Sequence, residues 1–213
     1  MTSRRLPVYL LLDTSGSMRG EPIESVNVGL RAMLACLRQN PYALESVHLS
    51  IVTFDSKVQE VLPLTPLESV VLPEIRTPES GATFLGEGLY FICENVDREV
   101  RKSSPDQKGD WRPLLFVMTD GKPSDTLAYS EVIPRVKASR FAAVIACAAG
   151  PKAVPEQLKL LTDKVVSLDT MDSNAFSSFF QWVSATVTSG STSMGATDSL
   201  ELPPPPPEVQ VVF

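Results

Sequence analysis

Three short segments of the sequence carry side-chain oxygens of the kind that bind a small, hard divalent cation. Asp13-Thr14-Ser15-Gly16-Ser17 directly follows the apolar run at 8–12 and places one carboxylate and two hydroxyls on one loop. The second segment contributes Thr83, and the third, Thr119-Asp120-Gly121, contributes another carboxylate. Oxygen ligands of these kinds suit Mg²⁺ better than softer metals. The sequence therefore predicts a metal site formed by Asp13, Ser15, Ser17, Thr83 and Asp120.

This set of ligands also predicts how the ion is used. Mg²⁺ takes about six oxygens in octahedral geometry and normally keeps several waters. If the two carboxylates act largely through bound water, the inner ligands are the neutral hydroxyls of Ser15, Ser17 and Thr83, and the ion stays electron-poor. An Asp or Glu of a partner protein is then a favourable last ligand. The pattern favours binding over catalysis.

The sequence offers little else that an enzyme would need at this site. His48 is the only histidine, and it lies at the start of a predicted strand, remote from the three loops. The remaining candidates for a general base are carboxylates already assigned to the metal. No phosphate-binding loop ending in Lys-Ser/Thr is present, and Gly86-Glu87-Gly88 lacks the third glycine of a dinucleotide site. Two alternatives stay open: a magnesium-dependent hydrolase or phosphotransferase, and a degenerate domain used only for packing.

Alternating buried strands and amphipathic helices form the predicted scaffold. Strands are expected at 7–12, 47–54, 57–61, 114–118, 141–148 and 165–168, and helices at about 21–38, 84–101, 126–139, 155–163 and 173–189. Polar and apolar residues alternate at 57–61, which is typical of an antiparallel edge strand. The proline-rich stretch 62–82 is predicted to be mostly loop. Pro134 is expected to kink or restart its helix, and Gly190 to end the last one.

This order of elements predicts an α/β fold with a Rossmann-like, open and mostly parallel sheet, one antiparallel edge strand and helices on both faces. The loops that follow parallel strands lie at one edge of the sheet, and ligands bind there where the strand order reverses. Asp13 and Asp120 are predicted to end neighbouring strands. Thr83 precedes a helix and is expected to reach the same crevice.

Composition excludes several classes of partner. The chain of 213 residues has a formal net charge of -6 and a pI near 4.9, without a dense Lys/Arg face, so nucleic acid is not an expected partner. No run approaches the roughly 18 apolar residues of a membrane span. Cys36, Cys93 and Cys147 lie in apolar surroundings and are expected to be reduced core thiols. These features predict a cytoplasmic protein.

Residues 1–190 are expected to form one domain and residues 191–213 a tail rich in Ser, Thr, Gly and Pro. The run Pro203 to Pro207 favours an extended polyproline II rod. Composition slightly favours a mobile terminus. The alternative is that the rod presents an extra strand to a sheet edge on this or another chain, through the apolar residues Val209, Val211, Val212 and Phe213.

The three polar segments, taken together, resemble the metal-ion-dependent adhesion site of von Willebrand factor type A (vWA) domains. The resemblance covers roughly residues 6–188 and includes every position of the motif in order, although Gly81-Ala82-Thr83 stands where the family usually has Gly-Gly-Thr. It implies the vWA fold, Mg²⁺ with Mn²⁺ or Ca²⁺ as alternatives, and a non-enzymatic protein-binding role. Residues around such a site would form the partner-binding rim: Gly16, Met18, Asp55, Phe84 and Lys122.

Within this family the chain is most similar to the short bacterial TerY-like proteins, which are associated with tellurite resistance and stress response. That similarity implies a scaffold that works beside a protein kinase and a protein phosphatase.

Overall fold

A seven-stranded sheet forms the centre of the molecule, in the order β3-β2-β1-β4-β5-β6-β7. The computed structural model describes residues 4–78, 81–193, 200 and 202–213. The strands are β1 (Leu6–Asp13), β2 (Val47–Phe54), β3 (Val58–Pro66), β4 (Leu114–Thr119), β5 (Ala143–Ala149), β6 (Val165–Leu168) and β7 (Gln210–Val211). The five inner strands are parallel, and β3 pairs with β2 as the predicted antiparallel edge. The tail adds β7 as a short antiparallel strand at the other edge.

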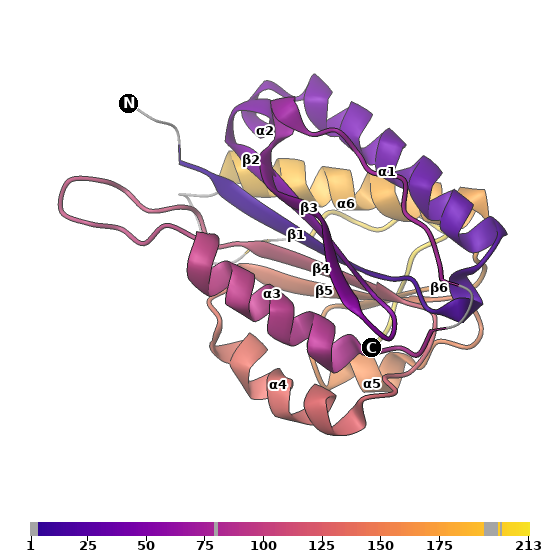
Figure 1. The fold of residues 1–213 in the computed structure, drawn as a ribbon. Coiled ribbons are helices and arrows are strands. Elements are labelled where there is room, and N and C mark those ends of the chain that lie inside the picture. The colour runs from indigo at the N-terminus through magenta and orange to yellow at the C-terminus, as the bar shows by residue number, and fades with distance from the viewer. Residues whose placement is uncertain (1–3, 79–80, 194–199, 201) are drawn as a thin grey trace.

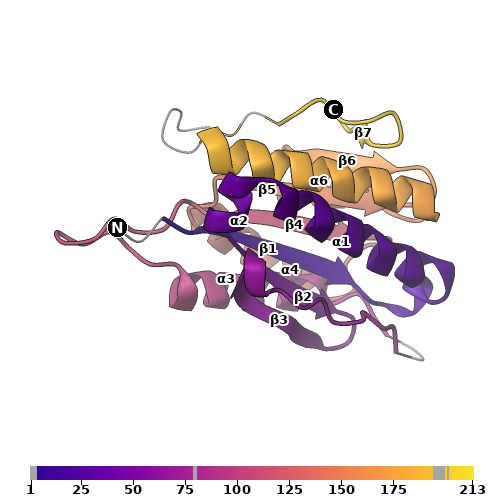
Figure 2. The ribbon, with the colours of Figure 1, turned by 90° about the horizontal axis from the view of Figure 1, so that it is seen from above.

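Helices cover both faces of this sheet, as the sequence predicted (Figures 1 and 2). One face carries α1 (Glu21–Gln39), α2 (Pro41–Ser46) and α6 (Ser173–Ser193), and the other carries α3 (Leu85–Glu99), α4 (Thr126–Ala138) and α5 (Pro155–Lys159). Two short 3-10 turns, η1 (Gly16–Met18) and η2 (Leu67–Ser69), complete the set. No helix in the described ranges has both the length and the apolar character needed to cross a membrane.

Strand β1 shows why the sequence folds into layers. All eight of its residues are buried, and successive side chains point to opposite faces. Leu10 packs in the core under α1 and α6, whereas Leu11 packs in the core under α3 and α4. Helices α1 and α6 approach closely because Gly29 has no side chain: a Cβ there would lie 2.3 Å from Cδ2 of Phe180. The central strand is thereby fixed on both sides.

At three places an element continues beyond its predicted end or break. Strand β3 continues to Pro66, because an edge strand tolerates proline and Pro63 falls at a register shift in its pairing with β2. Helix α4 continues through Pro134, where the carbonyl that loses its hydrogen bond belongs to exposed Ser130. Helix α6 continues past Gly190 to Ser193, because Gly190 does not adopt the left-handed conformation that ends helices.

Two further features were also not anticipated. The sequence analysis expected no helix at Pro41–Ser46, where Asn40 caps α2 by accepting a hydrogen bond from the amide of Ala43 at 3.0 Å. Cys36 is exposed on α1, so it is not a core thiol, whereas Cys93 and Cys147 are buried as expected. Burial raises the pKa of both buried thiols.

The described part of the tail packs against its own chain. Trp182 on α6 donates a hydrogen bond from Nε1 to the carbonyl of Pro203 at 2.9 Å, and Val209 is only 2% exposed. The amide of Val212 donates to the carbonyl of Val165 at 2.9 Å. The sequence left two possibilities for the tail, a mobile terminus and an extra strand at a sheet edge. In the structure the tail forms the extra strand, and it pairs with β6 of its own chain. Residues 194–199 and 201, which also belong to the predicted tail, lie outside the described residues.

Candidate metal centre

The first and third polar segments follow adjacent strands at the point where the strand order reverses. Strand β1 lies between β2 and β4, so the chain builds the sheet outward from β1 in both directions. Leu12 pairs with Met118 across β1 and β4, which brings the next residues, Asp13 and Thr119, side by side at the carboxyl ends of the two strands. A hydrogen bond between the side chains of Asp13 and Thr119 therefore joins the two segments directly.

Asp13 is fully buried and held by both of its oxygens. Oδ1 accepts a hydrogen bond from the amide of Ser15 at 2.7 Å, and Oδ2 accepts one from Oγ1 of Thr119 at 2.5 Å. Burial raises the pKa of Asp13 to about 6, the hydrogen bonds from Ser15 and Thr119 partly oppose that rise, and the carboxylate of Asp120 adds to it. A carboxylate oxygen has capacity for a second contact. The side chain is thus fixed in place but still able to accept a water or an ion.

Asp120 supplies the observation that bears most directly on a metal. Its Oδ1 is buried and has no hydrogen-bond partner among the described residues, and the whole side chain is only 2% exposed. An unpaired buried carboxylate oxygen costs free energy. The carboxylate of Asp120 also lies close enough to Asp13 to raise the pKa of Asp13. A cation would satisfy this oxygen and offset the repulsion between the two groups. The residues present therefore fit a divalent ion.

The three hydroxyl side chains belong to the same cluster. Oγ of Ser15 and Oγ of Ser17 are 3.3 Å apart, with Ser15 buried and Ser17 exposed. Oγ1 of Thr83 lies 3.7 Å from the position that a Cβ on Gly121 would occupy, so it stands against the loop that carries Asp120. The cluster thus has buried carboxylates below and Ser17 at the solvent side.

Backbone contacts fix the second loop to the third. The amide of Thr83 donates to Oγ of Ser124 at 3.1 Å, and the amide of Ser124 donates to the carbonyl of Thr83 at 2.9 Å. Ala82 replaces the usual second glycine without strain, because no described residue other than glycine has a positive φ. Gly81 is required for a different reason: a Cβ there would lie 2.9 Å from Cβ of Asp55.

Asp55 connects the loops rather than only lining the rim. Its Oδ2 accepts a hydrogen bond from Oγ1 of Thr14 at 3.1 Å, and its carbonyl accepts one from the amide of Phe84 at 3.0 Å. It therefore ties the loop after β1 to the start of α3. Thr119 and Ser124 have comparable positioning roles that the sequence analysis did not assign. Thr119 was detectable as the last strand residue before Asp120, whereas nothing in the sequence linked Ser124 to Thr83.

Four of the five predicted rim residues are at least partly accessible. Gly16, Asp55 and Phe84 are partly exposed and Lys122 is exposed. Met18 is a correction, because it is fully buried in the core beneath α1 and α6. The 3-10 turn η1 directs this apolar side chain inward, and so it is not available to a partner.

Clusters of acidic, histidine and cysteine side chains do not supply a metal site in the part of the chain that the structure describes. Within the described ranges, no group of three or more His, Cys, Asp or Glu side chains could hold a metal, so hydroxyls must complete the site. Such a set favours hard cations. His48 pairs with Pro7 at the start of the parallel strands, whereas Asp13 pairs with Phe54 at their end. The histidine therefore lies at the opposite end of the strands from the metal loops.

Comparison with solved structures identifies the same architecture elsewhere. Proximal thread matrix protein 1 from the mussel byssus (crystal form 2) superposes with a TM-score of 0.64 at 19% identity, covering 87% of this chain and 48% of that one. A second structure of that protein, described as having a zinc-occupied MIDAS motif (the metal-ion-dependent adhesion site), gives 0.61 at 18% identity with coverages of 87% and 48%. A von Willebrand factor type A protein from Catenulispora acidiphila gives 0.63 at 15% identity, covering 88% and 43%.

The chain spans about half the length of these structures, and at these identities the likeness shows the fold alone. A search of curated protein sequences found no significant match. A family profile described as von Willebrand factor type A domain matches residues 8–181, which is most of the chain and contains all three polar loops. The chain therefore belongs to the von Willebrand factor type A domain family, whose members are metal-dependent protein-interaction modules.

Proposed function

We propose that this protein is a non-enzymatic binding module in which a divalent cation, held by Asp13, Ser15, Ser17, Thr83 and Asp120, captures an Asp or Glu of a partner protein. The observation that carries the proposal is the buried and unpaired Oδ1 of Asp120, beside a second buried carboxylate. An apolar or purely packing role gives no reason to keep two carboxylates there. A cation does, because it satisfies the oxygen and reduces the repulsion.

Magnesium is the ion that the oxygen ligands favour, with Mn²⁺ or Ca²⁺ as alternatives. When bound, the ion supplies a positive centre that attracts a carboxylate from outside. The chain's own residues set the approach. Exposed Ser17 lies at the solvent side of the cluster, and exposed Lys122 adds a positive charge at the rim. Both favour an acidic side chain over other groups.

The partner and setting rest on the sequence resemblance. The TerY-like pattern supports a scaffold in the bacterial cytoplasm that assembles with a protein kinase and a protein phosphatase during tellurite or other stress. Affinity purification of the tagged chain from stressed cells, with Mg²⁺ or with chelator, tests this assignment. Recovery of neither enzyme class in Mg²⁺ would refute the assignment but leave metal binding itself untouched.

Ser17 is the residue whose change separates metal binding from folding. It is exposed, and among the described residues its side chain hydrogen-bonds to Ser15 alone, so Ser17→Ala should leave the free energy of unfolding in chelator nearly unchanged. Loss of one inner ligand should weaken Mg²⁺ or Mn²⁺ binding, measured by titration calorimetry, by about tenfold or more. Ser69→Ala, at an exposed serine on η2 away from the three loops, is the matched control.

Two results would overturn the proposal. Equal metal affinity in the wild type, Ser17→Ala and Asp13→Ala would remove the site. Turnover of simple phosphate esters that needs Mg²⁺ and disappears in Asp13→Ala would instead establish the alternative, a hydrolase or phosphotransferase on the same scaffold.

A further inference from the structure

A hollow lies at the opposite end of the sheet from the metal loops. It has a volume of about 490 Å³ and is formed where β5 and β6 begin, between the end of α4 and the segment after α5. The metal loops follow the other ends of the strands, and a strand as long as β5, with 7 residues, spans roughly 20 Å. The hollow is therefore a separate site, of the size typical of small-molecule pockets, about 300–1,000 Å³.

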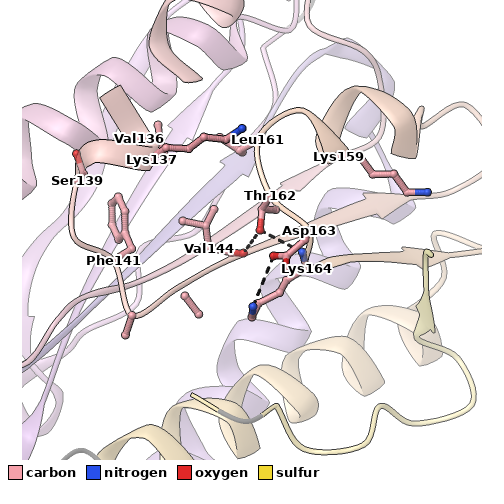
Figure 3. A pocket seen from close by; sticks show the side chains of 12 residues that line it. Val136, Lys137, Ser139, Phe141, Val144, Lys159, Leu161, Thr162, Asp163 and Lys164 are labelled. Carbon is pink, nitrogen blue, oxygen red and sulfur yellow. Dashed lines mark hydrogen bonds and ion pairs between the residues drawn. The ribbon is translucent and has the colours of Figure 1, made fainter. Parts of the chain in front are cut away.

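Apolar side chains form part of the floor of the hollow, and the hydroxyl groups beside them are already used. Phe141 and Val144 line it, together with the aliphatic side chains of Val136 and Leu161 (Figure 3). Oγ1 of Thr162 donates to the carbonyl of Val144 at 2.7 Å and accepts from the amide of Lys164 at 3.1 Å. Oγ of Ser139 donates to the carbonyl of Arg135 at 2.9 Å. These groups keep the floor rigid but leave no hydroxyl proton for a ligand.

Positive charge surrounds this floor, in a chain whose net charge is -6. Three lysines line the hollow against a single aspartate: Lys137, Lys159 and Lys164 with Asp163. Lys159 donates to the carbonyl of Phe213. Lys164 is 3.5 Å from Asp163, whose side chain is 88% exposed, so solvent weakens that pair. Among the described residues, Lys137 has neither a hydrogen bond nor an ion pair, and its ammonium group is available.

The arrangement in space matches an amphipathic ligand. In the view of Figure 3, the side chains of Val144 and Thr162 lie between Lys137 and Lys164, and Phe141 lies to the left of Val144. A neutral apolar molecule would leave the ammonium groups unused, and a small inorganic anion would leave the apolar floor uncovered. A ligand with a flat apolar body and one acidic group uses both. A lysine ammonium group can bind either a phosphate or a carboxylate, because it acts as a point charge whose N–H donors can rotate toward the anion.

We propose that this hollow binds a small aromatic organic anion, with its ring on Phe141 and Val144 and its acidic group beside Lys137, while Lys164 adds positive charge on the other side of the hollow. The site is independent of the divalent cation. It gives the domain a second ligand-binding site, at the end of the sheet opposite the metal loops.

The test uses 4-fluorophenyl phosphate as the probe, followed by fluorine NMR of the ligand in the presence of chelator, so that the metal site cannot contribute. We expect saturable binding in the millimolar range or tighter. Lys137→Gln and Lys164→Gln should each weaken binding of the probe by about threefold or more, since each removes one positive charge that attracts the acidic group. Lys152→Gln, at an exposed lysine after β5 near the other end of the sheet, should have no effect.

Companion probes separate the two parts of the ligand. 4-Fluorobenzoate should bind if the acidic group alone matters, and stronger binding of the phosphate would assign the class to phosphate esters. 4-Fluorophenol and inorganic phosphate should each bind much more weakly than either aromatic anion. Equal binding by inorganic phosphate, equal binding by the phenol, or unchanged binding in both pocket variants would overturn the proposal. None of these outcomes depends on whether the metal site binds an ion.

Discussion

Asp120→Asn should change the stability of the protein in opposite directions with and without a divalent cation. The substitution keeps the shape of the side chain but removes its negative charge. In the metal-free protein the wild-type carboxylate has a buried oxygen without a hydrogen-bond partner among the residues that the structure describes, and it lies close enough to the buried carboxylate of Asp13 to raise the pKa of that group. A neutral amide costs less to bury than a charged group. The variant should therefore be the more stable protein in chelator.

The size of the effect follows from the cost of an unpaired buried polar group, about 1–3 kcal/mol, of which the neutral amide retains a part. A gain of about 1–2 kcal/mol corresponds to an increase in Tm of about 2–8 °C for a chain of this length. Saturating Mg²⁺ reverses the order, because binding at a hundred times the Kd adds about 2.7 kcal/mol to the wild type and little to the variant.

Thermal and urea unfolding in chelator and in excess Mg²⁺ measure all four free energies. Asp106→Asn, at an exposed aspartate in the loop before β4, controls for the change in net charge and should behave as wild type under both conditions. A variant that is less stable than wild type in chelator would mean that Oδ1 of Asp120 is not an unsatisfied group. An equal difference under both conditions would mean that the side chain does not bind the ion.

Two other predictions concern the scaffold that holds the site. Gly86→Ala would place a Cβ 2.3 Å from the backbone nitrogen of Tyr129, so it should destabilise the contact between α3 and α4 by about 1–3 kcal/mol with or without metal, as measured by urea unfolding. Gly121→Ala, with its nearest atom at 3.7 Å, should be tolerated, and a larger loss there than at Gly86 would contradict the packing argument. Trp182→Phe removes the hydrogen bond to the carbonyl of Pro203 and should speed amide exchange at Val212, measured by hydrogen–deuterium exchange, while Tm falls by only a few degrees. Unchanged protection of Val212 would show that the tail strand is held without this bond.

Periodicity along the chain was sufficient to predict the class of fold, because a strand buried on both faces and an amphipathic helix leave different patterns. The run that became β1 is continuously apolar, and all eight residues of the strand are buried. Local signals from single residues were less informative. Proline and glycine commonly interrupt helices, but α4 continues through Pro134 and α6 through Gly190. The carbonyl that loses its hydrogen bond to Pro134 is exposed to solvent, and Gly190 does not have a positive φ.

The candidate site divides in the same way. The place of Asp13 and Asp120 after predicted strands was enough to expect them together, because parallel strands deliver their following loops to one end of the sheet. Their role as metal ligands with Ser15, Ser17 and Thr83 stays a prediction. The side chains that fix these loops were not predictable. Asp55 was expected only at the rim, and its contacts with Thr14 and Phe84 exist only once the loops have come together.

The sequence alone determined which chemical groups the molecule has and which end of the sheet they occupy. Only the tertiary structure decided that Met18 is buried, that the tail forms a strand beside β6, and that one oxygen of Asp120 has no hydrogen-bond partner in the described part of the chain. The physical reason is that strand and helix periodicity is local, whereas burial and hydrogen-bond satisfaction depend on atoms that are distant in the chain and meet only after packing.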